Sequence, residues 1–248
     1  LVVHSYLPED IEQGLANVGI PSLTQFSAMT LEDTYQQIQQ LGQATGNSEE
    51  AETVVIEMRQ KIDELIARAS GFAPSTFYHE LDQTYYSVTS TTFIGQVYAL
   101  IGLANIADAA DEAGSGYPQL SEEYILSQNP DLIFLADTKC CGQSAETVAE
   151  RNGWGALTAV SEGRVIELDD DIASRWGPRV VDFFEAVVIA MEQIAAWAMA
   201  VTGALYFLLG LLCCKSQRDL RNQRALIHRA KEQGFLEQLL QEAEDKIE

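Results

Sequence analysis

The chain has 248 residues, 47% of them hydrophobic, and a formal net charge of −22 at pH 7. That length suits one two-lobed domain or two small domains, and the apolar content excludes global disorder. The charge is uneven, because residues 215–248 hold seven basic and seven acidic side chains whereas residues 1–214 hold 8 basic and 30 acidic ones. Such an acidic surface repels nucleic acids and anionic membranes, and it suits a soluble domain outside the cytoplasm.

The first 45 residues alternate strand and helix patterns. Residues 1–4 are typical of a buried strand, residues 8–17 of a helix and residues 22–26 of a second strand. Thr30 and Asp33 form the capping box of a further helix. This βαβα order predicts a parallel sheet covered by helices. Because the sequence starts with Leu1 inside a strand, we expect further sequence upstream.

Residues 47–70 carry the longest helical pattern of the acidic part, since Val54, Met58, Ile62 and Ile66 recur every four residues. We interpret this helix as a rigid connector between two α/β halves. An ordinary helix covering a sheet is the alternative.

From Pro74 onward the strand and helix patterns alternate again. Apolar strands are predicted at residues 76–80, 131–136 and 164–168, and helices at 91–103, 121–128 and 178–193, the second of these capped by Ser121. A turn is predicted at residues 102–106.

Residues 194–214 contain no charged side chain and are long enough to cross a bilayer. Six basic residues follow within residues 215–231, so the positive-inside rule predicts a transmembrane helix with the acidic domain outside and the tail, residues 215–248, in the cytoplasm. A buried core helix is the alternative. Residues 235–247 have the pattern of an amphipathic helix, which can pair with a partner or with a second copy of itself.

The four cysteines form two adjacent pairs, Cys140-Cys141 and Cys213-Cys214, without the spacing of a zinc site. Cys213 and Cys214 end an apolar run, which is typical of lipidation or of plain packing. Cys140 and Cys141 are predicted in a polar loop. The sequence leaves open a bridge between these neighbours, two free thiols, or a bridge from one of them to another segment.

Six stretches occur in a fixed order between residues 74 and 193, and each alone is a weak signal. Together they resemble the C-terminal lobe of the cobalamin- and siderophore-binding proteins, the helical-backbone class (class III) of periplasmic solute-binding proteins that serve ABC importers. The stretches are YYSVTSTTFIG at 85–95, GLANIA at 102–107, YPQLSEE at 117–123, NPDLIFL at 129–135, GWGAL at 153–157, and GRV at 163–165 leading to RWGPR at 175–179.

This resemblance covers residues 1–193 and implies an α/β fold of two lobes, each a helix-covered sheet of parallel type, joined by one long helix. The expected parts are a partial, incomplete N-terminal lobe at 1–46, the connecting helix at 47–71 and the C-terminal lobe at 72–193. The transmembrane helix, 194–214, and the helical tail, 215–248, lie outside the resemblance, so a fusion or gene-calling artefact is an alternative origin for them.

The resemblance implies a ligand, a ferric siderophore or a corrinoid such as cobalamin, held in the cleft between the lobes by aromatic walls and a few polar groups. Arg175 and Asp171 match the variable loop that faces this cleft, and Trp176 can stack on a ligand or pack below the loop. An ion pair between Arg175 and a neighbouring aspartate is the alternative for those two. Four further aromatic residues match the cleft or its rim, although at least one of the last three is expected in the core: Tyr117, Tyr85, Tyr86 and Phe93.

Glu123 matches the glutamate with which members of this family dock on permease arginines. The alternative is that Glu123, like Glu122, stabilises the positive end of the 121–128 helix. No cofactor is expected, because a solute-binding protein catalyses no reaction.

Two other functions compete with this interpretation. Direct zinc or manganese binding needs several histidines with carboxylates, and the chain has three histidines, His4, His79 and His228, of which His79 lies near Glu80 and Asp82. The second competing function is that of a single-pass membrane sensor, in which an outer domain binds the solute and the cytoplasmic tail recruits a partner. Enzymes are disfavoured, because the sequence has no phosphate loop, GxSxG motif or Cys/His dyad.

Overall fold

The computed structural model describes the backbone of residues 1–212 and the side chains of residues 1–196. The chain divides into two compact units, Leu1–Met191 and Glu192–Glu248, and the first of them holds nearly all the described side chains. The expected membrane segment, 194–214, lies mostly outside the described side chains, and the tail, 215–248, lies outside the described residues. Among the described residues, no helix has both the length and the apolar character needed to cross a bilayer.

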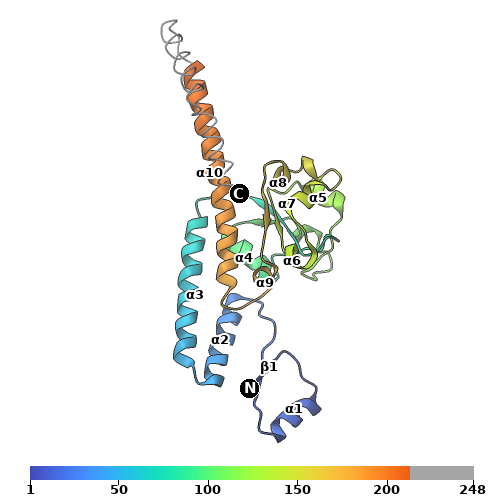
Figure 1. Ribbon diagram of the computed structural model, residues 1–248, viewed down its shortest axis with the longest axis vertical. Coiled ribbons are helices and arrows are strands. Elements are labelled where there is room, and N and C mark those ends of the chain that lie inside the picture. The colour runs from blue at the N-terminus through green and yellow to red at the C-terminus, as the bar shows by residue number, and fades with distance from the viewer. Residues whose placement is uncertain (213–248) are drawn as a thin grey trace. The chain divides into compact units, whose positions relative to one another are not determined.

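The N-terminal segment is a small βαβ unit. Strands β1 (Val2–His4) and β2 (Ser22–Thr24) pair in parallel, and α1 (Glu9–Asn17) connects them (Figure 1). The prediction that residues 1–4 are buried was wrong: Leu1 and Val3 are 46% and 47% exposed. The reason is that β1 pairs with β2 alone and α1 buries none of its residues.

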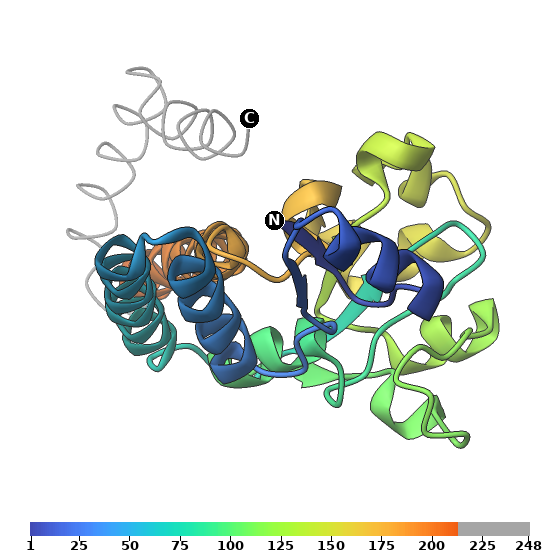
Figure 2. The same ribbon diagram turned by 90° about the horizontal axis from the view of Figure 1, so that it is seen from below.

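Helices α2 (Leu31–Thr45) and α3 (Ser48–Ala69) form an antiparallel hairpin, visible as two adjacent helices in Figures 1 and 2. The predicted capping box is present, since the Thr30 side chain accepts from the amide of Asp33 and the Asp33 side chain accepts from the amide of Thr30. Gly42 lets the helices approach closely, because a Cβ atom there would lie 2.3 Å from the Cβ of Ala51. Helix α3 contacts α4 as well as α2, so it joins the N-terminal helices to the C-terminal sheet.

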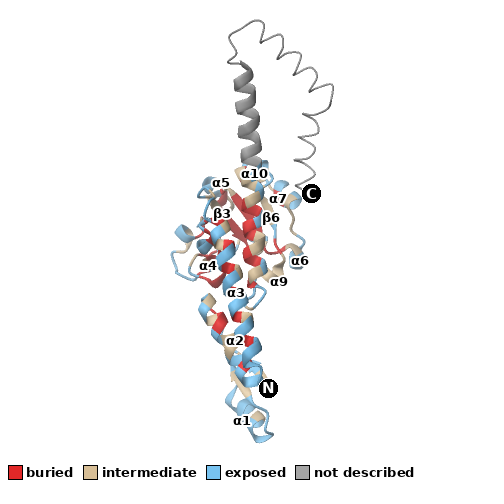
Figure 3. Ribbon diagram, turned by 90° about the vertical axis from the view of Figure 1, so that its left-hand side faces the viewer, coloured by how far each residue is buried: buried red, intermediate tan, exposed pale blue. Residues whose placement is uncertain are grey.

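The C-terminal sheet has four parallel strands in the order β4-β3-β5-β6. Three were predicted, β3 (Thr76–Glu80), β5 (Leu132–Leu135) and β6 (Val165–Glu167). The fourth, β4 (Ala104–Asn105), lies where a turn was predicted, since two residues are too few for an alternating pattern. Buried residues concentrate in and around this sheet (Figure 3).

One face of the sheet packs on α4 (Phe93–Ile101) and on the first turns of α10 (Val180–Leu212). The Tyr98 ring lies 4.1 Å from Phe77, 4.9 Å from Phe134 and 5.3 Å from Phe183, measured between centroids. Gly95 allows α4 to approach the preceding loop, because a Cβ atom there would lie 1.9 Å from the carbonyl oxygen of Thr89.

The other face packs on α5 (Glu122–Gln128), α7 (Ala145–Ala149) and α8 (Thr158–Ser161). Trp154 is fully buried there among Tyr78, Ile133 and Leu135. Two more short helices, α6 (Thr138–Cys141) and α9 (Asp170–Ala173), follow β5 and β6. Cys140 and Cys141 therefore lie in a helical turn rather than in the predicted polar loop, and a disulfide joins them.

Candidate ligand-binding site

The strand order places the topological switch point of the sheet at the carboxyl ends of β3 and β5. The connection from β3 leads to β4 on one side, and the connection from β5 leads to β6 on the other. In open parallel sheets, ligands bind where neighbouring connections diverge in this way. Glu80 ends β3 and Asp137 follows β5, so two carboxyl groups lie at this point.

A buried ion pair between Arg151 and Glu80 lies at this switch point. The two terminal nitrogens of Arg151, Nη1 and Nη2, each donate to Glu80 at 2.6 Å, and Nη2 also donates to Gln143 Oε1 at 2.7 Å. The same guanidinium lies 4.6 Å from the ring of Trp154, which is a cation–π distance. Because Glu80 is fully buried, its charge depends on this bidentate partner.

Tyr85 stacks on Trp154 with 5.7 Å between ring centroids, and Arg151 lies 5.7 Å from its ring. Its φ is 68°, in the left-handed region that a bulky side chain rarely adopts. This strained backbone is held by hydrogen bonds from Tyr85 N to Asp82 O and from Leu120 N to Tyr85 O. Tyr85, which was predicted at the cleft rim, thus packs against the buried Trp154.

Asp137, at the same switch point, is a buried carboxyl group without a hydrogen-bond partner among the described residues. It occupies the N-cap position of α6 without capping it, and both carboxyl oxygens are buried. Burial, together with the nearby negative charge of Glu80, raises the pKa of Asp137 to about 7, although Arg151 opposes this shift. The hydroxyl of Tyr78 is also buried and unpaired within the described part.

Asp170, from α9, caps α6 in place of Asp137. Its carboxylate accepts from the backbone amides of Thr138, Lys139 and Cys140 at 2.8–3.0 Å. The Lys139 ammonium lies 2.6 Å from Asp169. These contacts join the turn that carries the disulfide to the loop that precedes α10.

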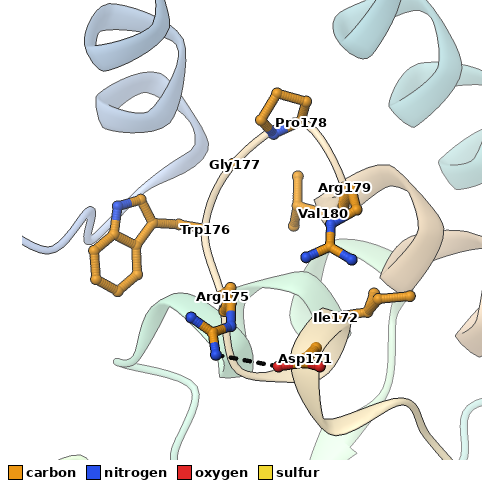
Figure 4. A pocket seen from close by; sticks show the side chains of 8 residues that line it. All are labelled: Asp171, Ile172, Arg175, Trp176, Gly177, Pro178, Arg179 and Val180. Atoms are coloured by element: carbon orange, nitrogen blue, oxygen red, sulfur yellow. Dashed lines mark hydrogen bonds and ion pairs between the residues drawn. The ribbon is translucent and has the colours of Figure 1, made fainter.

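That loop lines a pocket of about 220 Å³ (Figure 4). Arg175 Nη2 donates to Asp171 Oδ1 at 3.1 Å, and Trp176 Nε1 donates to Gln37 Oε1 of α2 at 3.2 Å. In Figure 4 the indole of Trp176 points away from the two arginines. The full lining is Asp171, Ile172, Arg175, Trp176, Gly177, Pro178, Arg179 and Val180.

The remaining predicted site residues do not join this pocket. Tyr86 and Tyr117 are 40% and 49% exposed, on two segments joined by the bridge between Tyr86 and Gln119. Phe93 is a core residue of α4, because it starts the apolar stripe that Val97 and Ile101 continue. Glu123 is exposed in the first turn of α5.

Sequence reasoning missed Arg151, Asp137 and Arg179. Arg151 lies 71 residues from Glu80, so no local pattern joins the pair. Arg179 was visible only as the last letter of the RWGPR stretch.

The described residues include no group of three or more His, Cys, Asp or Glu side chains that could hold a metal ion. His79 is fully buried with its Nδ1 2.8 Å from the hydroxyl of Tyr98, and burial lowers its pKa to about 3. Its neighbour Glu80 forms an ion pair with Arg151. Asp82 accepts a hydrogen bond from the amide of Thr84 at 2.7 Å, so all three residues that suggested metal binding have other partners.

The chain is similar to known binding proteins. An uncharacterized ABC transporter substrate-binding lipoprotein of Bacillus subtilis, YvrC, is 29% identical over 181 residues, which are 71% of this chain and 55% of that protein. A cobalamin-binding protein of Halobacterium salinarum is 28% identical over 173 residues, 68% of this chain and 46% of that protein. The chain therefore spans about half the length of the curated relatives it matches.

A solved structure shows the same fold. The periplasmic heme-binding protein RhuT of Roseiflexus sp. RS-1, in its apo form, matches with a TM-score of 0.64 at 20% identity, covering 77% of this chain and 74% of that one. The family model described as periplasmic binding protein matches residues 1–172, which is more than half of the sequence. The chain belongs to the periplasmic binding protein family.

Proposed function

We propose that this chain is the extracytoplasmic solute-binding component of an ABC importer that captures a metal chelate, an iron-siderophore, a corrinoid or a similar molecule. The observation that carries the proposal is the pocket before α10, which two arginines and a tryptophan line on a binding-protein fold. Large chelates are held by aromatic walls with a few directed polar groups, and the lining of this pocket includes one aromatic residue, Trp176, and two directed cations, Arg175 and Arg179. The cobalamin-binding and heme-binding relatives support the class of ligand.

Binding is tested by calorimetric titration with a ferric siderophore, cyanocobalamin, heme and zinc chloride. We expect one of the chelates to bind with one-to-one stoichiometry, and Trp176→Ala to weaken it. Tyr6→Ala is the control, because Tyr6 is 78% exposed and lies outside the pocket. Stoichiometric zinc binding without a response to any chelate would refute the proposal.

The proposed partner is an ABC permease, docked through Glu123. The neighbouring Glu122 accepts a hydrogen bond from Trp154 Nε1 at 3.1 Å, whereas the Glu123 carboxylate makes no hydrogen bond or ion pair within the described residues. An exposed charge of this kind sets the orientation and association rate of a complex. Glu123 is therefore the acid of this turn that is available to a partner.

Glu123→Arg should slow complex formation and reduce chelate uptake severely, while the affinity for the ligand in solution stays unchanged. The matched control is Glu146→Arg, an exposed acid in the first turn of α7. Radiolabelled uptake and solution affinity are measured for both variants. Normal uptake by the Glu123 variant would remove this residue from the docking surface.

The proposed anchor is the uncharged segment 194–214, with the acidic domain outside and the basic tail inside. Protease added to intact cells should digest the acidic domain and spare an epitope placed after residue 248. Lysed cells are the control, in which both are digested. Protection of the acidic domain in intact cells would contradict this topology.

A further inference from the structure

The pocket before α10 has the opposite charge to its surroundings. Residues 1–214 hold 30 acidic and only 8 basic side chains. Two of those eight, Arg175 and Arg179, lie four positions apart and line this one pocket, where Asp171 is the single acidic residue of the lining. A local positive site in a strongly negative domain favours an anionic group over a neutral one.

Arg179 differs from the other basic side chains. Six basic residues form ion pairs with carboxylates, whereas the guanidinium of Arg179 forms no hydrogen bond or ion pair among the described residues; the six are Arg59, Lys61, Lys139, Arg151, Arg164 and Arg175. Arg179 acts only at a distance, where its charge adds to that of Lys139 in lowering the pKa of Asp169. Its guanidinium donors are thus available to a ligand at the pocket.

Arg175 is held by a counter-ion that a ligand can replace. Its bond to Asp171 is 3.1 Å long, and the two side chains are 69% and 52% exposed. An ion pair so exposed to water contributes little stability, so a ligand carboxylate can take the place of Asp171. Asp171 also lies 3.9 Å from Lys139, which gives the released carboxylate a second partner.

The size of the pocket limits what it holds. Its volume of about 220 Å³ is below the usual range of a site for a whole drug-sized ligand, roughly 300–1,000 Å³. Ile172, Pro178 and Val180 provide apolar walls. The pocket therefore suits one arm of a larger molecule, with a planar charged end that matches the fork of a guanidinium.

We propose that this pocket is a subsite for a carboxylate arm of the ligand, with Arg179 as its anchor and Arg175 joining after it leaves Asp171. The inference rests on the proposed function and narrows it to chelates that carry free carboxylates. Neutral hydroxamate chelates and cyanocobalamin bind more weakly than carboxylate chelates to this protein.

The test compares two ferric chelates by calorimetry on the whole chain, a polycarboxylate chelate and the neutral cyclic trihydroxamate ferrioxamine E. Arg179→Gln should weaken the carboxylate chelate by about ten- to a hundredfold, because a charge-assisted bidentate contact is lost. It should leave ferrioxamine within about twofold. Asp171→Asn should strengthen the carboxylate chelate several-fold, because the competing counter-ion is gone.

Arg59→Gln is the control for net charge, since Arg59 pairs with Glu32 on the α2–α3 hairpin, outside the pocket lining. Equal losses of affinity in the Arg59 and Arg179 variants would overturn the subsite, as would equal losses of affinity for both chelates.

Binding of free citrate, measured by NMR line broadening, separates the subsite proposal from the proposed function. Citrate binding that depends on Arg179 without capture of any chelate leaves the subsite and refutes the function. Capture of ferrioxamine without binding of any carboxylate leaves the function and refutes the subsite.

Discussion

Two buried titratable side chains of the C-terminal lobe, Asp137 and His79, affect stability in opposite directions. The pKa of Asp137 is about 7 in the folded chain and 3.8 in the unfolded reference, so the folded state binds the extra proton between these values. Stability therefore falls as the pH rises from about 4 to 7. The pKa of His79 is about 3 against 6.5, so the unfolded state binds the extra proton and stability rises with pH over about 3 to 6.5. Over most of this range the two slopes cancel.

Asp137→Asn should expose the slope of His79. Asparagine keeps the shape of the protonated acid and cannot ionise, so the variant should gain stability relative to the native chain by about 1.4 kcal/mol per pH unit between pH 5 and 7. Urea unfolding at several pH values measures the difference, in which the other carboxylates cancel. Asp63→Asn, at an exposed position on α3, is the control. Parallel stability curves for the Asp137 variant and the native chain would show that Asp137 is ionised when folded.

At the scale of elements, α6 depends on a cap from a different part of the chain. Burial alone raises the pKa of Asp170, but the amide of Cys140, the hydroxyl of Thr138 and the amides of Lys139 and Thr138 all donate to it and hold that pKa below its ordinary value. The carboxylate thus fixes the first turn of α6 and the disulfide within it. The loop that leads to the pocket is fixed at the same point.

Asp170→Ala should lower the free energy of unfolding by about 0.5–2 kcal/mol, the usual cost of losing a helix cap. Amide hydrogen exchange at residues 138–141 should become faster, and dithiothreitol should reduce the disulfide sooner. Asp169→Asn is the matched control, because it removes the exposed ion pair with Lys139 and leaves the three amide contacts. Unchanged exchange in the Asp170 variant would show that α6 does not need this cap.

The elements that the sequence predicted are those with a long or strongly apolar pattern. Strands β3, β5 and β6 are short apolar runs bounded by polar residues, and α3 repeats its apolar positions over 22 residues. Helices α6, α8 and α9 have four residues each, which is too short for periodicity to appear.

The candidate site was predictable where its residues are neighbours in sequence. Asp171, Arg175 and Trp176 were expected together because one loop carries them all, and the structure places them around one pocket. The pairing of Glu80 with Arg151 was not predicted, because a tertiary contact between residues 71 positions apart leaves no local sequence pattern. Phe93 was misplaced because an aromatic residue at the start of an apolar helix looks the same in sequence whether it faces the core or a cleft.

For the whole molecule, the net charge of −22 is the dominant electrostatic fact. Like charges repel in the compact state, and salt screens this repulsion over a Debye length of about 10 Å at 0.1 M. Salt also weakens exposed ion pairs such as Arg59–Glu32, but each of these is worth less than about 1 kcal/mol. Repulsion among the unpaired acids therefore outweighs them.

The melting temperature should rise between 10 and 300 mM NaCl, by about 2–4 °C for each kcal/mol of repulsion that is screened. Differential scanning fluorimetry measures it, and an uncharged osmolyte at equal osmolality is the control. A melting temperature that falls with salt would mean that ion pairs outweigh the excess charge.

The all-parallel order of the C-terminal sheet has a consequence for how the chain reaches this structure. Thr76 and Asp131, whose side chains bond where β3 and β5 begin to pair, are 55 residues apart in sequence. No hairpin can nucleate such a sheet. The chain therefore loses the entropy of closing a long loop before the contacts between the central strands stabilise it. The rate-limiting step should be the meeting of β3 and β5, with β4 and β6 adding afterwards at the edges. A domain built this way folds slowly, and its apolar strands stay exposed to aggregation until the central pair forms.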